Sequence, residues 1–333
     1  MNRREFVARL TAAGAAGALG LDPRPSAAEP PPESTRITLL QSPSICEAPE
    51  QMAKEFLLGG EGFTDVRYFK VDGSVAAFTA LAAGQVDVAQ LTSLGVVLRL
   101  DAGDPLLILG GVHVGCFELF ATERVRSVRD LKGKTVAVPG MGTNQHAYIA
   151  SMAAYVGLDP SRDINWVVRR GPEAMQLLAE GKIDGFIGFP PEPQLLRAKR
   201  IGRVIVNTTT DRPWSEHFCC MVVANRDWAR KHPTAAKRAL RSILKADAVC
   251  AADRDRAARL MVERGYTADF DLALRTLQEM PYGRWREYDP ENTVRFFALR
   301  LREAGMTKST PQKIIAQGTD WRFLNELKKE LKG

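Results

Sequence analysis

The sequence contains no Cys-x-x-Cys pair, although it has five cysteines, at positions 46, 116, 219, 220 and 250. This excludes the spacing typical of zinc ribbons and thioredoxin-like redox sites, and 333 residues are too many for a scaffold built from disulfides. No segment approaches about 18 uncharged apolar residues, so the sequence predicts no membrane-spanning helix. The net charge of +7 comes from Lys and Arg interleaved with acids, which argues against nucleic-acid binding.

Residues 1–28 predict an export signal. A charged start with Arg3-Arg4 is followed by an Ala/Gly/Leu-rich stretch, and Ser26-Ala27-Ala28 supplies the small residues of a cleavage site. The arginine pair followed by Glu5-Phe6 resembles a twin-arginine signal, which predicts a periplasmic protein; an ordinary secretory signal is the alternative. The Pro-rich residues 29–35 predict a short tether.

Two copies of a β-α-β-α-β pattern follow, which predicts an α/β protein with mostly parallel sheets. The expected segments are 36–44, 46–60, 66–71, 74–84 and 85–93 in the first copy, and 134–144, 145–157, 164–170, 171–181 and 182–192 in the second. Both copies carry Leu-Ala-x-Gly-x-Val/Ile-Asp, ending at Asp87 and Asp184. We expect these two aspartates to bind backbone amides where a strand begins, in preference to a catalytic role.

Polar and glycine-rich loops follow the predicted strands, where open α/β sheets bind their ligands. The candidate ligand-binding residues in these loops are Gln41, Ser42, Thr92, Ser93, Gly142, Thr143, Asn144, Gly188 and Phe189. Residues 139–146 resemble a dinucleotide-binding turn, but Gln145 stands where its third glycine is required. The start of the following helix therefore predicts a site for an anion or another polar group.

The phrase SVRDLKGKTVAVPGMGTNQHAYI at 127–149, together with the duplicated Gly-x-Val/Ile-Asp units, resembles solute-binding proteins of the nitrate/sulfonate/taurine type. This group includes THI5-like binders of pyrimidine precursors. The resemblance implies a type II periplasmic-binding-protein fold: two lobes, each with a parallel-rich sheet, and a cleft between them. The implied boundaries are 36–118 for lobe one, 119–217 for lobe two, and 218–333 for the return to lobe one with C-terminal helices.

The resemblance implies a monomer that captures a small organic solute by lobe closure and delivers it to the membrane permease of an ABC transporter, without a cofactor. The candidate loops contain no Arg or Lys, which favours an aromatic, heterocyclic or larger anionic solute over nitrate. The resemblance also implies that Cys116–Thr122 and His217–Asn225 cross between the lobes at the cleft floor. Cys116 and His217 on these crossings join the candidate ligand-binding residues, as do His146, which is predicted near the cleft, and Trp214, whose ring could stack on a flat solute.

The cysteines leave several interpretations open. Cys219 and Cys220 are expected on opposite faces of one strand, which argues against both binding one metal ion. They either pack in the hinge, or one forms a disulfide with Cys116, or a metal binds with Cys46 and a histidine such as His113. An enzyme acting on a pyrimidine-type substrate is a further alternative, although no catalytic residue is predicted.

Overall fold

The computed structural model describes residues 29–41, 44–71 and 73–331. The contacts divide the chain into Met1–Pro31 and Pro32–Gly333, and only residues 29–31 of the first part are described. The predicted export signal at 1–28 lies outside the described residues. Within the described part of the chain, no helix is long and apolar enough to cross a membrane.

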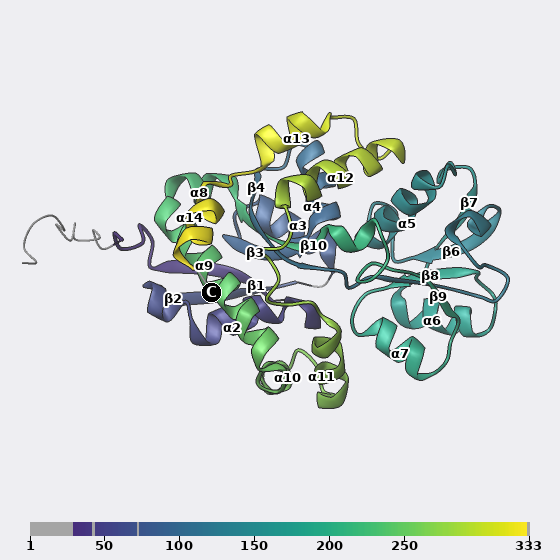
Figure 1. The fold of residues 1–333 in the computed structure, drawn as a ribbon, viewed down its shortest axis with the longest axis horizontal. Coiled ribbons are helices and arrows are strands. Elements are labelled where there is room, and N and C mark those ends of the chain that lie inside the picture. Colours follow the sequence, from purple (N-terminus) through teal and green to yellow (C-terminus); the bar gives the residue numbers. More distant parts are fainter. Residues whose placement is uncertain (1–28, 42–43, 72, 332–333) are drawn as a thin grey trace, which may run out of the picture. The chain divides into compact units, whose positions relative to one another are not determined.

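The first sheet has the strand order β2-β1-β3-β10-β4 (Figure 1). Strand β1 (Arg36–Gln41) pairs in parallel with both β2 (Asp65–Lys70) and β3 (Val88–Thr92). Strand β10 (Phe218–Asn225) runs antiparallel between β3 and β4 (Leu106–Val114). Every residue of β4 and β10 is buried, as expected for strands with both faces covered.

Lobe one consists of this sheet and the elements packed around it. They are η1 (Ile45–Glu47), α2 (Ala48–Phe56), η2 (Gly59–Glu61), α3 (Ser74–Ala82), α4 (Ser93–Asp101), α8 (Arg226–Lys231), α9 (Pro233–Ala252), α10 (Arg254–Glu263), α11 (Phe270–Glu279), α12 (Pro290–Glu303), α13 (Pro311–Gly318) and α14 (Arg322–Glu330). Five of them begin with a side-chain cap: Asn225, Asp253, Asp269, Asp289 and Thr310 each accept a backbone N–H as helix N-caps.

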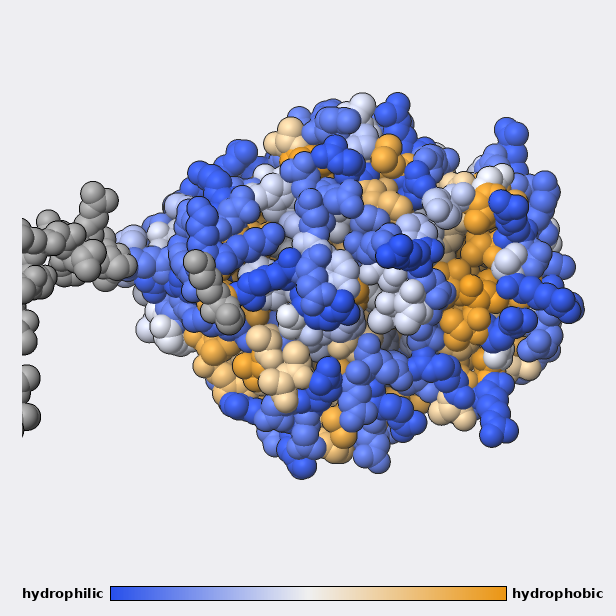
Figure 2. All heavy atoms as spheres, viewed as in Figure 1, coloured by the Kyte–Doolittle hydropathy of each residue, from blue (hydrophilic) through white to orange (hydrophobic). Residues whose placement is uncertain are grey.

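The second sheet has the order β7-β6-β8-β5-β9. Its strands are β5 (Glu118–Ala121), β6 (Lys134–Val138), β7 (Ile164–Val168), β8 (Gly185–Gly188) and β9 (Arg203–Asn207). Together with η3 (Val128–Leu131), α5 (Asn144–Tyr155), α6 (Gly171–Ala179) and α7 (Glu192–Ala198), they form lobe two. The face seen in Figure 2 is mostly hydrophilic, with an apolar strip over the strands of this lobe.

Both lobes repeat one plan, in which four strands run parallel and one, β10 or β5, runs antiparallel. Asp87 accepts the Thr38 N–H at 2.7 Å, and Asp184 accepts the Thr135 N–H at 3.0 Å. In each lobe, 49 residues separate the two partners. The two aspartates do bind backbone amides, as expected, but these amides are not local: each belongs to the first strand of the unit, which lies beside the strand that the aspartate precedes.

Candidate functional site

Two short segments join the sheets and lie side by side. Thr208 exchanges hydrogen bonds with Phe117 through both its backbone and its hydroxyl, and the Cys116 N–H donates to Thr209 Oγ1 at 3.3 Å. Gly115 precedes them with φ +78° and lies against Thr209. The crossings expected at Cys116–Thr122 and His217–Asn225 are therefore displaced: most of the first range is β5, and most of the second is β10.

The N-termini of two helices from different lobes meet beside these crossings. Helix α4 begins at Ser93, whose hydroxyl donates to the carbonyls of Phe218 and Cys219 and so ties the helix to β10. Helix α5 begins at Asn144, whose Oδ1 lies against Gly95 in the first turn of α4. Gly95 is required there, since a methyl group would also lie 2.6 Å from the Phe78 ring.

Aromatic side chains line the same region. The ring centroids of Phe117 and Tyr148 lie 4.4 Å apart, and those of Phe117 and Phe189 lie 5.9 Å apart. Tyr148 also meets the edge of Phe297 on α12. These contacts pack the first crossing, α5 and the loop after β8 against one another. Phe117, Tyr148 and Phe297 are buried, whereas Phe189 is partly exposed and is the ring suited to contact an apolar or flat molecule.

Most of the other predicted site residues lie beside this region but are engaged in contacts of their own. His146 and Thr143 stabilise their own loop, since His146 Nδ1 accepts the Gly142 N–H at 3.1 Å and Thr143 caps α5. Gln41 ends β1 half-buried, and Gly188 is buried at the end of β8, beside Glu192. Thr92 pairs with Cys220 across the sheet, whereas Ser42 lies outside the described residues.

Trp214 and His217 pack on α12. The His217 ring stacks on Phe296 with centroids 3.8 Å apart, and Trp214 meets the edges of Phe296 and Tyr155. Burial, together with the charge of Arg300, lowers the pKa of His217 to about 4, so this imidazole is neutral at pH 7. Both side chains anchor the return segment to lobe one.

The five cysteines are buried thiols, and four of them gather near the crossings. Cys116 Sγ lies 2.9 Å from Cys219 Sγ, which identifies Cys219 as the neighbour of Cys116. The expected separation of Cys219 and Cys220 is wrong: their sulfurs lie 4.0 Å apart. The cause is an irregular register where β10 pairs with β4 at Cys220, because a bulge breaks the simple alternation of side chains.

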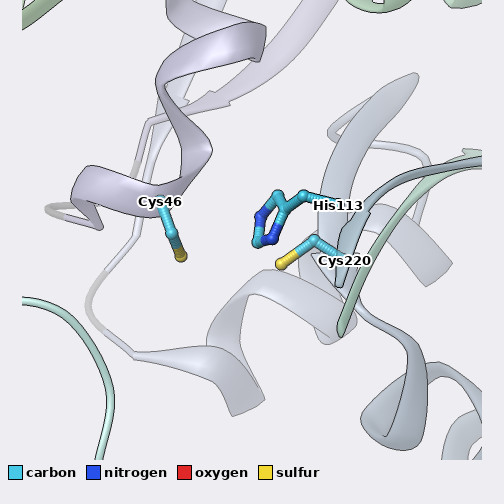
Figure 3. A group of neighbouring side chains, drawn as sticks. All are labelled: Cys46, His113 and Cys220. Carbon is cyan, nitrogen blue, oxygen red and sulfur yellow. The ribbon is translucent and has the colours of Figure 1, made fainter. Parts of the chain in front are cut away.

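A second group combines Cys46, His113 and Cys220 (Figure 3). Cys46 lies on η1 just after β1, whereas His113 and Cys220 pair across β4 and β10. Their side chains are 4%, 1% and 3% exposed. Sequence reasoning named Cys46 and His113 only as metal alternatives. The signal that indicates the group is that Cys46 follows β1, His113 lies near the end of β4 and Cys220 lies near the start of β10, in one sheet.

Burial and neighbouring thiols set the electrostatics of this group. Burial alone lowers the pKa of His113, but the charges of Cys220 and Cys46 outweigh it and raise that pKa well above its usual range. Hydrogen bonding from Cys116 lowers the pKa of Cys220 to about 7, whereas burial raises the pKa of Cys116.

Comparison with known proteins identifies the family. The model of the NMT1-like family matches residues 31–264, which is more than half of the chain. The chain belongs to the NMT1-like family. A curated relative is the taurine-binding periplasmic protein of Escherichia coli, 25% identical over 211 residues, which are 63% of this chain and 63% of the relative. The match thus spans less than two thirds of that relative's length.

Solved structures confirm the fold expected for an NMT1-like protein. The alkanesulfonate-binding protein SsuA from Xanthomonas axonopodis pv. citri, bound to MOPS, has a TM-score of 0.69 at 17% identity, covering 87% of this chain and 99% of that one. The periplasmic nitrate-binding protein NrtA from Synechocystis PCC 6803 has a TM-score of 0.73 at 17% identity, covering 91% and 90%. The predicted family and the periplasmic-binding-protein fold are both confirmed.

Proposed function

We propose that this NMT1-like protein is the periplasmic solute-binding component of an ABC importer. It captures a small organic solute when its lobes close, and the closed form delivers the solute to a membrane permease. Support comes from the family, from the name of the taurine-binding relative, and from two hydrogen-bonded crossings that suit a hinge between two lobes.

One observation carries this proposal: α4 and α5 begin in different lobes and meet at Gly95 and Asn144. Free N–H groups at helix N-termini favour an anionic or polar group. A solute with such a group would be held between the helices by contacts with both lobes, and binding of this kind stabilises the closed form.

An aromatic side chain indicates the chemistry of the part of the solute that does not contact the helix N-termini. Phe189 lies next to the crossings and is half-buried, so its ring offers apolar area for a carbon chain or a flat heterocycle, whereas Phe117 and Tyr148 are buried. The candidate loops that follow β1, β3, β6 and β8 contain no Arg or Lys that could neutralise a small inorganic anion. We therefore infer an organic solute with one polar or anionic end and an apolar or aromatic body.

A thermal-shift screen over sulfonates, carboxylates, pyrimidines and aromatic acids tests the proposal. A solute present at about 100 times its Kd stabilises the protein by about 2.7 kcal/mol, which raises Tm measurably. Asn144→Ala is expected to weaken the binding of that solute. The matched control is Asn165→Ala, because Asn165 is an exposed residue of lobe two whose side-chain amide donates to the Gly133 carbonyl.

Two results would contradict the proposal. One is a screen in which no small solute shifts the Tm of the exported protein. The other is mass spectrometry showing that the solute is converted during incubation, which would instead support the enzyme alternative. A bound solute recovered unchanged, with the protein found in the periplasmic fraction, supports the transport role.

A further inference from the structure

We propose that Cys46, His113 and Cys220 form a buried zinc-binding site, a property separate from solute capture. The two sulfurs and the ring nitrogen lie within 4.8 Å of one another. Figure 3 shows the side chains converging from η1 on one side and from β4 and β10 on the other. Thiolate and imidazole are the ligands that Zn²⁺ prefers in proteins.

The orientation of His113 is the observation that points to a ligand. Its Nδ1 lies 3.1 Å from the Val114 carbonyl oxygen, which can only accept, so Nδ1 carries the proton. In the neutral imidazole the lone pair is then on Nε2, which is buried and has no hydrogen-bond partner among the residues that the structure describes. A zinc-bound histidine has this arrangement, because its second nitrogen donates to a carbonyl or carboxylate.

The backbone around the three side chains is held firmly. The Cys46 carbonyl accepts hydrogen bonds from Gln90 Nε2 and from the Tyr282 hydroxyl, both at 3.0 Å. Cys220 is paired on both sides within the sheet, with Thr92 and with His113. A metal ion would therefore find its ligands already positioned, with little chain entropy to lose on binding.

Charge balance indicates a divalent ion. Two thiolates and one neutral imidazole carry a charge of about −2, which Zn²⁺ neutralises, and an uncompensated charge at a buried site is costly. Sulfur ligands exclude Mg²⁺ and Ca²⁺, which prefer oxygen. Cys220 also lies within 4.8 Å of the sulfurs of Cys116 and Cys219, so a further thiol is within reach of the ion.

Zinc binding by the full exported chain tests the site. After removal of metal with a chelator, the protein is incubated with Zn²⁺ alone and dialysed, and we expect one tightly bound zinc per chain and a raised Tm. X-ray absorption at the zinc edge is expected to show at least two sulfurs at about 2.3 Å and an imidazole nitrogen at about 2.0 Å.

Variants identify the ligands. Cys46→Ala, His113→Ala and Cys220→Ala are each expected to lose stoichiometric zinc, whereas Cys250→Ala retains it. Cys250 is the matched control, because it is a buried free thiol on α9 outside both cysteine groups. If a variant fails to fold, the zinc-edge spectrum of the unaltered chain shows whether sulfur and imidazole bind the zinc. A spectrum with only oxygen and nitrogen ligands, no retained zinc, or zinc retained by Cys46→Ala/Cys220→Ala overturns the proposal.

Discussion

Gly115 occupies a position that only glycine fits without strain. Its φ is +78°, and a methyl group there would lie 2.8 Å from the Cα of Thr209 in the neighbouring crossing. Gly115→Ala is expected to lower the free energy of unfolding by about 2–4 kcal/mol, because the left-handed backbone and the close approach both oppose a side chain. Urea denaturation measures this change.

Gly157→Ala is the control for backbone strain alone. Gly157 has φ +86°, and nothing lies within 4 Å of its added methyl group. We expect this variant to lose only about 1–2 kcal/mol. Equal losses at the two positions would mean that the contact between the crossings contributes nothing.

His217 predicts a pH dependence of stability. Its pKa falls from 6.5 in the unfolded chain to about 4 in the folded protein, so the unfolded chain binds more protons between these values. The stability contribution is fully present above pH 6.5 and is lost as the pH falls toward 4. In His217→Phe, which keeps the contact with Phe296, we expect a flatter profile of unfolding free energy over this window. If the unfolding free energies of the two proteins change in parallel with pH, the titration of His217 does not contribute to stability.

Among the structural elements, the first strand of each lobe depends on one carboxylate. Asp87→Ala leaves the Thr38 N–H without its partner, and Asp184→Ala does the same at Thr135. Each change is expected to lower the free energy of unfolding by about 1–3 kcal/mol. The two losses should add within about 0.5 kcal/mol, because the residues lie in different lobes.

Asp255→Ala provides the control, since its exposed pair with Arg259 on α10 contributes little. Losses at Asp87 and Asp184 no larger than this control, measured by chemical denaturation, would show that the repeated Gly-x-Val/Ile-Asp unit has no structural role.

The alternating strands and helices of both lobes could be predicted because their signals are local. Apolar runs, glycine stops such as Gly84 and Gly181, and polar loops each act within a few residues. The exact positions of the crossings could not be predicted, because the mostly apolar segments Glu118–Ala121 and Phe218–Asn225 fit a strand and a crossing equally well. Only strand pairing assigns each segment to one of the two sheets.

The candidate site was predicted less completely. Ser93, Asn144, Cys116 and Phe189 do lie near the crossings, as strand order predicts. The group of Cys46, His113 and Cys220 depends on residues far apart in the sequence and on a bulge in β10. The alternation of residues along a strand does not reveal a bulge, and it is the bulge that changes the side to which one of two adjacent cysteines points.

At the scale of the whole molecule, α7 of lobe two and α11 of lobe one are joined by a latch made of three residues. Arg197 and Gln194 donate to Glu279 at 2.5 and 2.8 Å. Glu279→Gln is expected to favour the open form and to raise the Kd for the solute about two- to five-fold, the range of a half-exposed ion pair. Calorimetry measures the affinity, and small-angle scattering measures the opening of the solute-free protein.

Glu287→Gln is the matched control, because Glu287 forms an exposed pair with Arg284 within lobe one. An unchanged affinity and scattering profile in Glu279→Gln would show that the latch does not hold the lobes together.

The central place of β10 has a consequence for synthesis of the chain. Lobe two is built from strands between Glu118 and Asn207, so it can close as soon as that stretch has left the ribosome. The sheet of lobe one is completed later, because β3 and β4 can pair with the strand between them only after Phe218–Asn225 has been synthesised. Until then both strands present open edges, which are templates for aggregation. A nascent chain that stalls after Asn207 is therefore the form of this protein most in need of a chaperone.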